Sequence, residues 1–141
     1  MFKKDTEKLL AEIKSDADMK KFLSRNQAEL TKPLHEFLNQ LLQEKNLNKA
    51  EVIKNSLLNI NYAYHIFLGK RKNPGRDKII AIGISMQLNL DELQYLLRYS
   101  GCGALYPRNS RDAIIISAVE QNLSVAETNS LLENLGENIL D

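Results

Sequence analysis

The chain has 141 residues, a formal net charge of +1 at pH 7, six glycines, three prolines and no tryptophan. This length can bury one hydrophobic core, and the composition favours an all-α protein. No apolar run approaches the roughly 20 residues of a membrane span, and the N-terminus lacks the apolar core of a signal peptide. The single cysteine, Cys102, forms no intrachain disulfide. We therefore expect a cytoplasmic protein with no membrane partner.

The first part of the chain, residues 1–30, predicts an N-terminal helical segment. Residues 5–14 and 18–25 carry apolar side chains at helical spacing, including Leu9 in the first helix and Phe22 in the second. The segment can pack on the core, bind a partner or pair with a second copy.

The next predicted helix starts near Pro33, with Thr31 as a possible cap and Pro33 in the first turn. Its apolar residues share one helical face. They are Leu34, Phe37, Leu38, Leu41 and Leu42. His35 falls on the polar side, and no second ligand is spaced to join it in a metal site.

Residues 47–72 predict two short helices joined by a sharp turn and followed by a basic tail. Val52 and Ile53 form the inner face of the first helix, and Leu58 is an apolar plug in the turn. Asn59 is a good N-cap for the second helix, because its side-chain oxygen can accept from free backbone N–H groups.

The second of these helices has one inner and one outer face, and it ends at Gly69. The residues of the inner stripe are Ala63, Ile66 and Phe67. The residues expected to point outward are Asn61, Tyr62, Tyr64 and His65, and the basic tail is Lys70, Arg71 and Lys72. This order suits a helix-turn-helix whose second helix enters the DNA major groove.

This stretch resembles the lambda-repressor/Cro-like (Xre) helix-turn-helix family over about residues 33–93. In that family an apolar residue is followed seventeen positions later by a helix-ending glycine, and then by a basic segment and a proline. The matching positions here are Val52, Gly69, Lys70 to Lys72 and Pro74. The resemblance implies a five-helix module that binds DNA.

Three positions depart from the family pattern. Ile53 stands where the family prefers alanine, and Leu57 stands where it prefers a glycine in the turn. Asn73 resembles a one-residue insertion before the proline. Residues 77–87 and 91–100 are predicted to form the last two helices of the module. The whole module is assigned to residues 31–101.

The C-terminal part, residues 102–141, repeats residues 76–101. Arg76-Asp77-x-Ile-Ile recurs 35 positions later as Arg111-Asp112-x-Ile-Ile. The same offset pairs Leu88 with Leu123, Leu90 with Val125, Glu92 with Glu127, Gln94 with Asn129, Leu96-Leu97 with Leu131-Leu132, and Gly101 with Gly136. We therefore predict a second helical hairpin at 109–136 that extends the core or makes an interface.

Charge is distributed unevenly along the chain. Residues 60–80 hold five basic residues and one acid, whereas residues 88–141 hold three basic and eight acidic residues. A compact basic patch beside an acidic half suits a protein that faces a polyanion with one side only. A solvated loop of ordinary charge is the alternative.

No catalytic constellation is found, so we expect neither an enzyme nor a cofactor. Gly101-Cys102-Gly103 lacks the strand and helix context of a phosphate loop. The two histidines, His35 and His65, have no convincing acidic partner for a metal site.

The candidate DNA-binding residues lie on the second helix and its basic tail. Asn61 can pair with adenine, the tyrosines can contact phosphate or a thymine methyl, and the tail can anchor phosphates. The whole set is Asn59, Asn61, Tyr62, Tyr64, His65, Lys70, Arg71 and Lys72. Asn59 can instead serve as a cap alone, and either tyrosine can be partly buried against neighbouring helices.

Two functional hypotheses follow. The first is a sequence-specific transcriptional regulator that binds double-stranded DNA as a homodimer, with one reading helix per half-site. The second is a protein-interaction adaptor or antitoxin-type binder that keeps a degenerate helix-turn-helix fold and holds a protein partner through the C-terminal hairpin.

Overall fold

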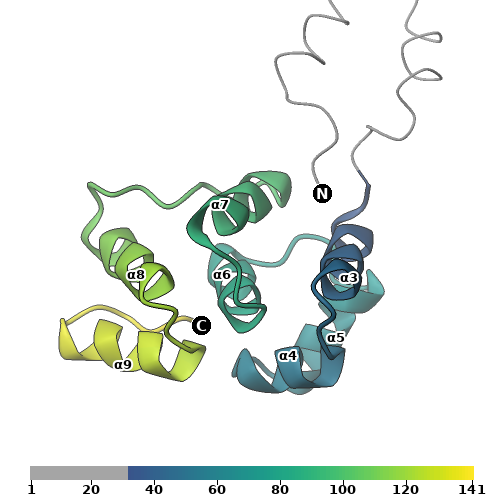
Figure 1. Cartoon of the computed structure of the whole chain (residues 1–141), viewed down its shortest axis with the longest axis horizontal. Coiled ribbons are helices and arrows are strands. Elements are labelled where there is room, and N and C mark those ends of the chain that lie inside the picture. The colour runs from purple at the N-terminus through teal and green to yellow at the C-terminus, as the bar shows by residue number, and fades with distance from the viewer. Residues whose placement is uncertain (1–31) are drawn as a thin grey trace, which may run out of the picture. The chain divides into compact units, whose positions relative to one another are not determined.

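Seven helices and no strand make up residues 32–141, the part of the chain that this computed structural model describes (Figure 1). The expected all-α class is confirmed for these residues. Pro33–Asp141 form one compact unit, so residues 33–101 and the C-terminal residues 102–141 belong to the same unit. The helices expected at 5–14 and 18–25, and Thr31, lie outside the described residues.

The helices occur where the sequence predicts them, with ends shifted by a residue or two. The first five are α3 (Leu34–Glu44), α4 (Lys49–Asn55), α5 (Ile60–Leu68), α6 (Arg76–Ser85) and α7 (Leu90–Tyr99). The C-terminal hairpin consists of α8 (Ser110–Glu120) and α9 (Val125–Asn134).

Side-chain caps define where most of these helices begin. The side chains of Asn48, Asn59, Asn89, Asn109 and Ser124 each accept a hydrogen bond from the backbone N–H three residues further on. These bonds satisfy donors that a helix leaves free in its first turn. The cap role expected for Asn59 is therefore confirmed.

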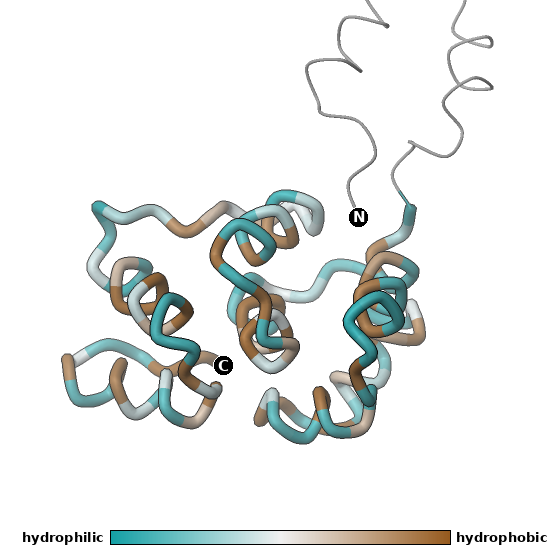
Figure 2. Tube along the Cα trace, viewed as in Figure 1, coloured by the Kyte–Doolittle hydropathy of each residue, from teal (hydrophilic) through white to brown (hydrophobic). Residues whose placement is uncertain are grey.

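The core forms around α6, which packs against α4, α7 and α9 (Figure 1). All six residues from Ile79 to Ile84 are buried, and this helix carries an almost continuous run of hydrophobic residues (Figure 2). The apolar stripes predicted for α3, α4 and α5 are buried against the same core, except that Leu34 is only partly buried.

The turn between α4 and α5 contains Leu57 in a left-handed conformation. Its φ is +61°, and its side chain is 58% exposed. A left-handed backbone brings the Cβ atom close to the following carbonyl oxygen, so this position favours glycine. The exposed leucine therefore occupies a strained backbone position and buries little surface in return.

We expect Leu57→Gly to stabilise the fold by roughly 0.5–1 kcal/mol, because relief of left-handed strain exceeds the extra entropy of an unfolded glycine. Denaturant unfolding measures this change. Leu57→Ala is the matched control, because it removes the exposed side chain but keeps the Cβ atom, and it should give no such gain. A loss of stability in Leu57→Gly would contradict the strain argument.

The predicted internal repeat is present in three dimensions as two helical hairpins, α6–α7 and α8–α9. Backbone outliers recur at the offset of 35: Gln87 and Asn122 have φ of 60° and 57°, and Gly101 and Gly136 have φ of 79° and 80°. The two hairpins face each other, with α6 against α9 and α7 against α8. Because α6 is equivalent to α8 and α7 to α9, these two contacts are reciprocal, as the contacts between two subunits are across an isologous interface.

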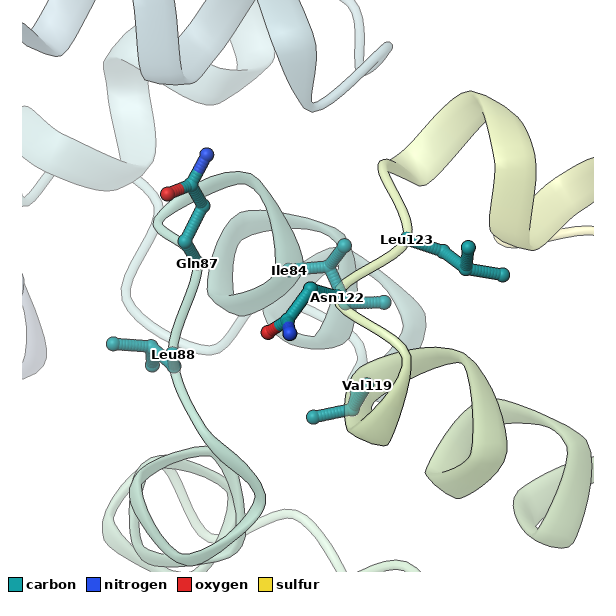
Figure 3. Close-up of a pocket in the computed structure, with 6 residues that line it drawn as sticks. All are labelled: Ile84, Gln87, Leu88, Val119, Asn122 and Leu123. Atoms are coloured by element: carbon teal, nitrogen blue, oxygen red, sulfur yellow. The ribbon is translucent and has the colours of Figure 1, made fainter.

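The cleft in Figure 3 lies between the connections of the two hairpins and has a volume of about 200 Å³. Its lining consists of three pairs of residues that are equivalent in the repeat. They are Ile84 with Val119, Gln87 with Asn122, and Leu88 with Leu123. The cleft therefore follows from the way the repeat copies meet.

Two ion pairs, which we call the Arg–Asp clamps, join α6 to α8 reciprocally. Arg76 donates to both carboxylate oxygens of Asp112 at 2.9 and 2.7 Å, and Arg111 donates to both oxygens of Asp77 at 3.0 and 2.8 Å. Bidentate pairs of this kind add direction as well as attraction. Each clamp therefore fixes the start of one hairpin on the start of the other.

The two hairpins differ at their outer faces. On α7, Tyr95 and Tyr99 pack against Phe37 of α3, with the Phe37 and Tyr99 rings stacked at 4.2 Å. The equivalent residues of α9 are Ser130 and Asn134. The second hairpin therefore carries polar residues at the positions where the first packs aromatic rings against α3.

The two hairpins also differ in the burial of one pair of equivalent leucines. Leu96 of α7 is fully buried, but its equivalent Leu131 in α9 is only partly buried. In the part of the chain that the structure describes, α9 lies at the end opposite α3 (Figure 1) and lacks the aromatic cover that α7 has. The leucine that the second hairpin buries completely is Leu132.

Candidate nucleic-acid interface

The start and the end of α5 are both held by local hydrogen bonds. At the start, the Asn59 Oδ1 atom accepts from the Tyr62 N–H at 3.0 Å. At the end, Gly69 has φ of +81°, and the N–H groups of Lys70 and Arg71 donate to the His65 carbonyl oxygen at 2.9 and 3.1 Å. The basic tail therefore begins directly against the last turn of α5.

The outer face of α5 has a polar part and an apolar part. Asn61 and His65 are exposed, as expected for residues that can reach a ligand. Ile60 and Leu68, at the two ends of the helix, are also exposed, at 60% and 57%. The face therefore offers an amide and an imidazole between two apolar side chains.

Tyr62 and Tyr64 are less exposed than outward-pointing residues would be, so the alternative of partial burial holds for both. Both are half-buried and pack against the hydrophobic core. The reason is that the helix borders other elements on two sides, so residues flanking the inner stripe also lose contact with water. Only a part of each tyrosine is available to a ligand.

The Tyr62 ring is flanked by two cations. The Arg71 guanidinium carbon lies 4.7 Å and the Lys78 Nζ atom 5.3 Å from the ring centroid. Cations in these positions are attracted by the negative face of the ring. Three segments therefore converge here: α5, the basic tail and the first turn of α6.

Lys78 is one of the cations around the Tyr62 ring, but it was not among the DNA-binding residues predicted from the sequence. Its charge was part of the basic balance of residues 60–80, which was the available signal. Its position beside Tyr62 depends on how α6 packs after the irregular segment 69–75, and no local pattern contains that information.

Lys72 and Arg71 also line a shallow cleft of about 380 Å³ between α3 and the end of α5. His35 also lines this cleft, and its half-buried ring lies against Gly69 rather than on a free polar side. A Cβ atom at position 69 would come within 2.7 Å of the His35 Nδ1 atom. Gly69 is therefore required both for its backbone conformation and for the approach of α3.

Asn39 ties α3 to this end of α5. Its Nδ2 atom donates to the carbonyl oxygens of His35 at 2.7 Å and Phe67 at 2.8 Å. The second bond satisfies a carbonyl that the helix end leaves free. The position of the basic tail is thus set by α3 as well as by α5.

Asp77 is the single acid among residues 60–80, and it is neutralised by its clamp to Arg111. The other clamp changes a pKa: the hydrogen bond from Arg76 holds the pKa of Asp112 below its usual value, although burial of this carboxyl opposes the effect. A bond from the Tyr106 N–H also lowers the pKa of Asp112.

The lowered pKa of Asp112 predicts an acid-dependent contribution to stability. It should be fully present above the unfolded pKa of about 3.9 and lost as the pH falls through the lower folded pKa. We expect Asp112→Asn to cost about 1.5–3 kcal/mol at pH 7, because it breaks a charged bidentate pair. Urea unfolding of both proteins at pH 7 and near pH 3 measures the difference, which should shrink in acid. A difference independent of pH would contradict the assignment.

Other kinds of site are not observed in the described residues. Within 32–141, no three His, Cys, Asp or Glu side chains are grouped as metal ligands. No helix in this range is long and apolar enough to cross a membrane.

Comparison with known proteins finds no family model that matches the sequence, no matching curated protein and no matching solved structure.

Proposed function

We propose that the protein is a sequence-specific DNA-binding transcriptional regulator of the lambda-repressor/Cro-like type, which reads the major groove with α5 and binds as a homodimer. The observation that carries this proposal is the surface formed by α5, its tail and the start of α6. Exposed Asn61 and His65 lie on the same short helix whose ends adjoin Lys70, Arg71 and Lys78. Base-reading groups beside phosphate-binding cations are what a major-groove reader needs.

The roles of the residues differ by their chemistry. Asn61 offers the donor and acceptor that match the edge of adenine, and Ile60 can contact a thymine methyl. Lys70, Arg71, Lys72 and Lys78 supply charge for phosphates, which gives affinity but little sequence information. Because Asn59 uses its oxygen as a cap, its role is to fix the first turn of α5.

The test is selection of bound sequences from a random duplex pool, followed by titration of Asn61→Ala. The variant should lose about 1–3 kcal/mol on the selected site and little on unrelated DNA, because it removes a base contact. The fold should be unchanged, since Asn61 is exposed. Asn134→Ala, which removes an exposed amide from the last position of α9, is the matched control and should bind as the wild type does.

Equal losses of Asn61→Ala on both duplexes would make Asn61 a backbone contact. An unchanged affinity for both would exclude α5 as the reading helix, and failure to select any sequence at low salt would exclude the regulator itself.

The second candidate function is binding of a protein partner by the same module, as an adaptor or an antitoxin-type binder. It is favoured by three large apolar side chains exposed around α5: Leu57, Ile60 and Leu68, at 58%, 60% and 57%. Large apolar side chains left exposed on a surface are a feature of many protein interfaces. Co-purification of a partner that Leu57→Ser/Ile60→Ser releases, with no DNA binding at low salt, would support this function.

A further inference from the structure

We propose that Arg111, in the C-terminal hairpin, is a positioning residue for the DNA-binding surface: it holds and neutralises Asp77, so that the cations around Tyr62 face a duplex without a competing carboxylate. This inference rests on the proposed function. It assigns a role in DNA binding to the second hairpin, which carries none of the residues that would touch the duplex.

Arg111 is held rigidly. Besides its two bonds to Asp77, its Nε atom donates to the Asn138 carbonyl oxygen at 3.0 Å and its Nη2 atom to the Ile139 carbonyl oxygen at 3.1 Å. Only about a quarter of the side-chain surface of either clamp partner is exposed, 21% for Arg111 and 26% for Asp77. The guanidinium therefore has one orientation, and that orientation places both of its terminal nitrogens on the carboxylate.

Asp77 is a negative charge close to the cations of the proposed DNA-binding surface. It directly precedes Lys78, whose ammonium is 5.3 Å from the centre of the Tyr62 ring, and Arg71 lies over the same ring. Charges this close are well within the ~10 Å screening length at 0.1 M salt. Without Arg111, the carboxylate would repel nearby phosphates and attract Lys78 away from Tyr62.

One further acid lies near Lys78. The Asp141 Oδ1 atom is 3.8 Å from the Lys78 Nζ atom, but the Asp141 side chain is 97% exposed. A long, fully solvated contact of this kind is weak and is screened by salt. Asp77, half-buried and fixed at the helix start, is therefore the acid whose neutralisation matters.

The second clamp, between Arg76 and Asp112, provides a matched control variant. Arg111→Gln and Asp112→Asn each break one bidentate pair between α6 and α8, at equivalent positions of the repeat. They differ in the charge that is left on α6: an unpaired Asp77 in the first variant, and an unpaired Arg76 in the second. A purely structural role predicts equal losses of DNA affinity, whereas charge positioning predicts a loss in Arg111→Gln and no loss in Asp112→Asn.

The experiment measures affinity for the selected duplex and for an unrelated duplex over a range of salt concentrations, with full-length wild type and variants. Arg111→Gln should weaken binding to both duplexes several-fold and lower the log–log salt slope by up to ~0.9, the value of one phosphate contact. Asp112→Asn should bind as tightly as wild type or more tightly. The addition of Asp77→Asn should restore the affinity of Arg111→Gln.

If Arg111→Gln is unstable, Arg111→Lys is the second variant to measure. It retains the positive charge that neutralises Asp77, so it should retain most of the affinity for DNA. Equal losses in Arg111→Gln and Asp112→Asn, or no rescue by Asp77→Asn, would overturn the inference while wild-type DNA binding stands. Wild-type protein that binds no duplex would instead remove the proposed function.

Discussion

Replacing Lys70, Arg71 and Lys72 together by alanine should weaken binding to every duplex alike and remove up to about 2.7 from the log–log salt slope. Each phosphate contact contributes ~0.9 to that slope, because binding releases condensed counterions from the DNA. All three residues are exposed, and the tail starts at a helix end that is fixed by Gly69. Their removal should therefore change the charge of the surface without unfolding it.

Arg108→Ala is the control for this triple variant, since it removes an exposed cation from the connection between α7 and α8, away from α5. It should leave the salt slope unchanged. The measurement is a set of titrations of the selected and the unrelated duplex at several salt concentrations. An unchanged slope in the triple variant would remove the basic tail from the DNA-binding face, whatever the effect on affinity at one salt concentration.

Leu97→Ala and Leu132→Ala should each destabilise the fold by about 2–5 kcal/mol, because each empties a fully buried site and leaves a cavity. These leucines are equivalent in the repeat, and both are 0% exposed. Their neighbours differ: Leu96 is equally buried, whereas Leu131 is partly exposed. We therefore expect Leu131→Ala to cost clearly less than Leu96→Ala.

Leu135→Ala is the control for the second hairpin, because this leucine is 59% exposed and its loss should change stability by no more than about 0.5 kcal/mol. Denaturant unfolding of the wild type and the five variants measures these differences. A neutral Leu132→Ala would mean that the second hairpin does not share a core with the first. A cost for Leu131→Ala as large as that for Leu96→Ala would contradict the observed difference in burial.

Features that depend on near neighbours in the chain could be predicted. The apolar spacing of α3 and the cap at Asn59 follow from helix geometry, in which residues three and four apart share a face. The left-handed Gly69 follows from the sterics of a single residue. The second hairpin could be predicted because its residues repeat the first at a constant offset, which carries the local pattern of one hairpin over to the other.

The sequence by itself therefore determined the seven helices of the described residues to within a residue or two, the repeat, and the outer face of α5 that holds Asn61 and His65. Only the tertiary structure decided which charges meet. Arg111 and Asp77 are 34 residues apart, and their pairing exists because α8 starts beside the start of α6. The half-burial of Tyr62, its position between Arg71 and Lys78, and the unequal burial of Leu96 and Leu131 have the same origin. Each depends on which elements pack against one another, and a side chain's periodicity along its own helix does not contain that information.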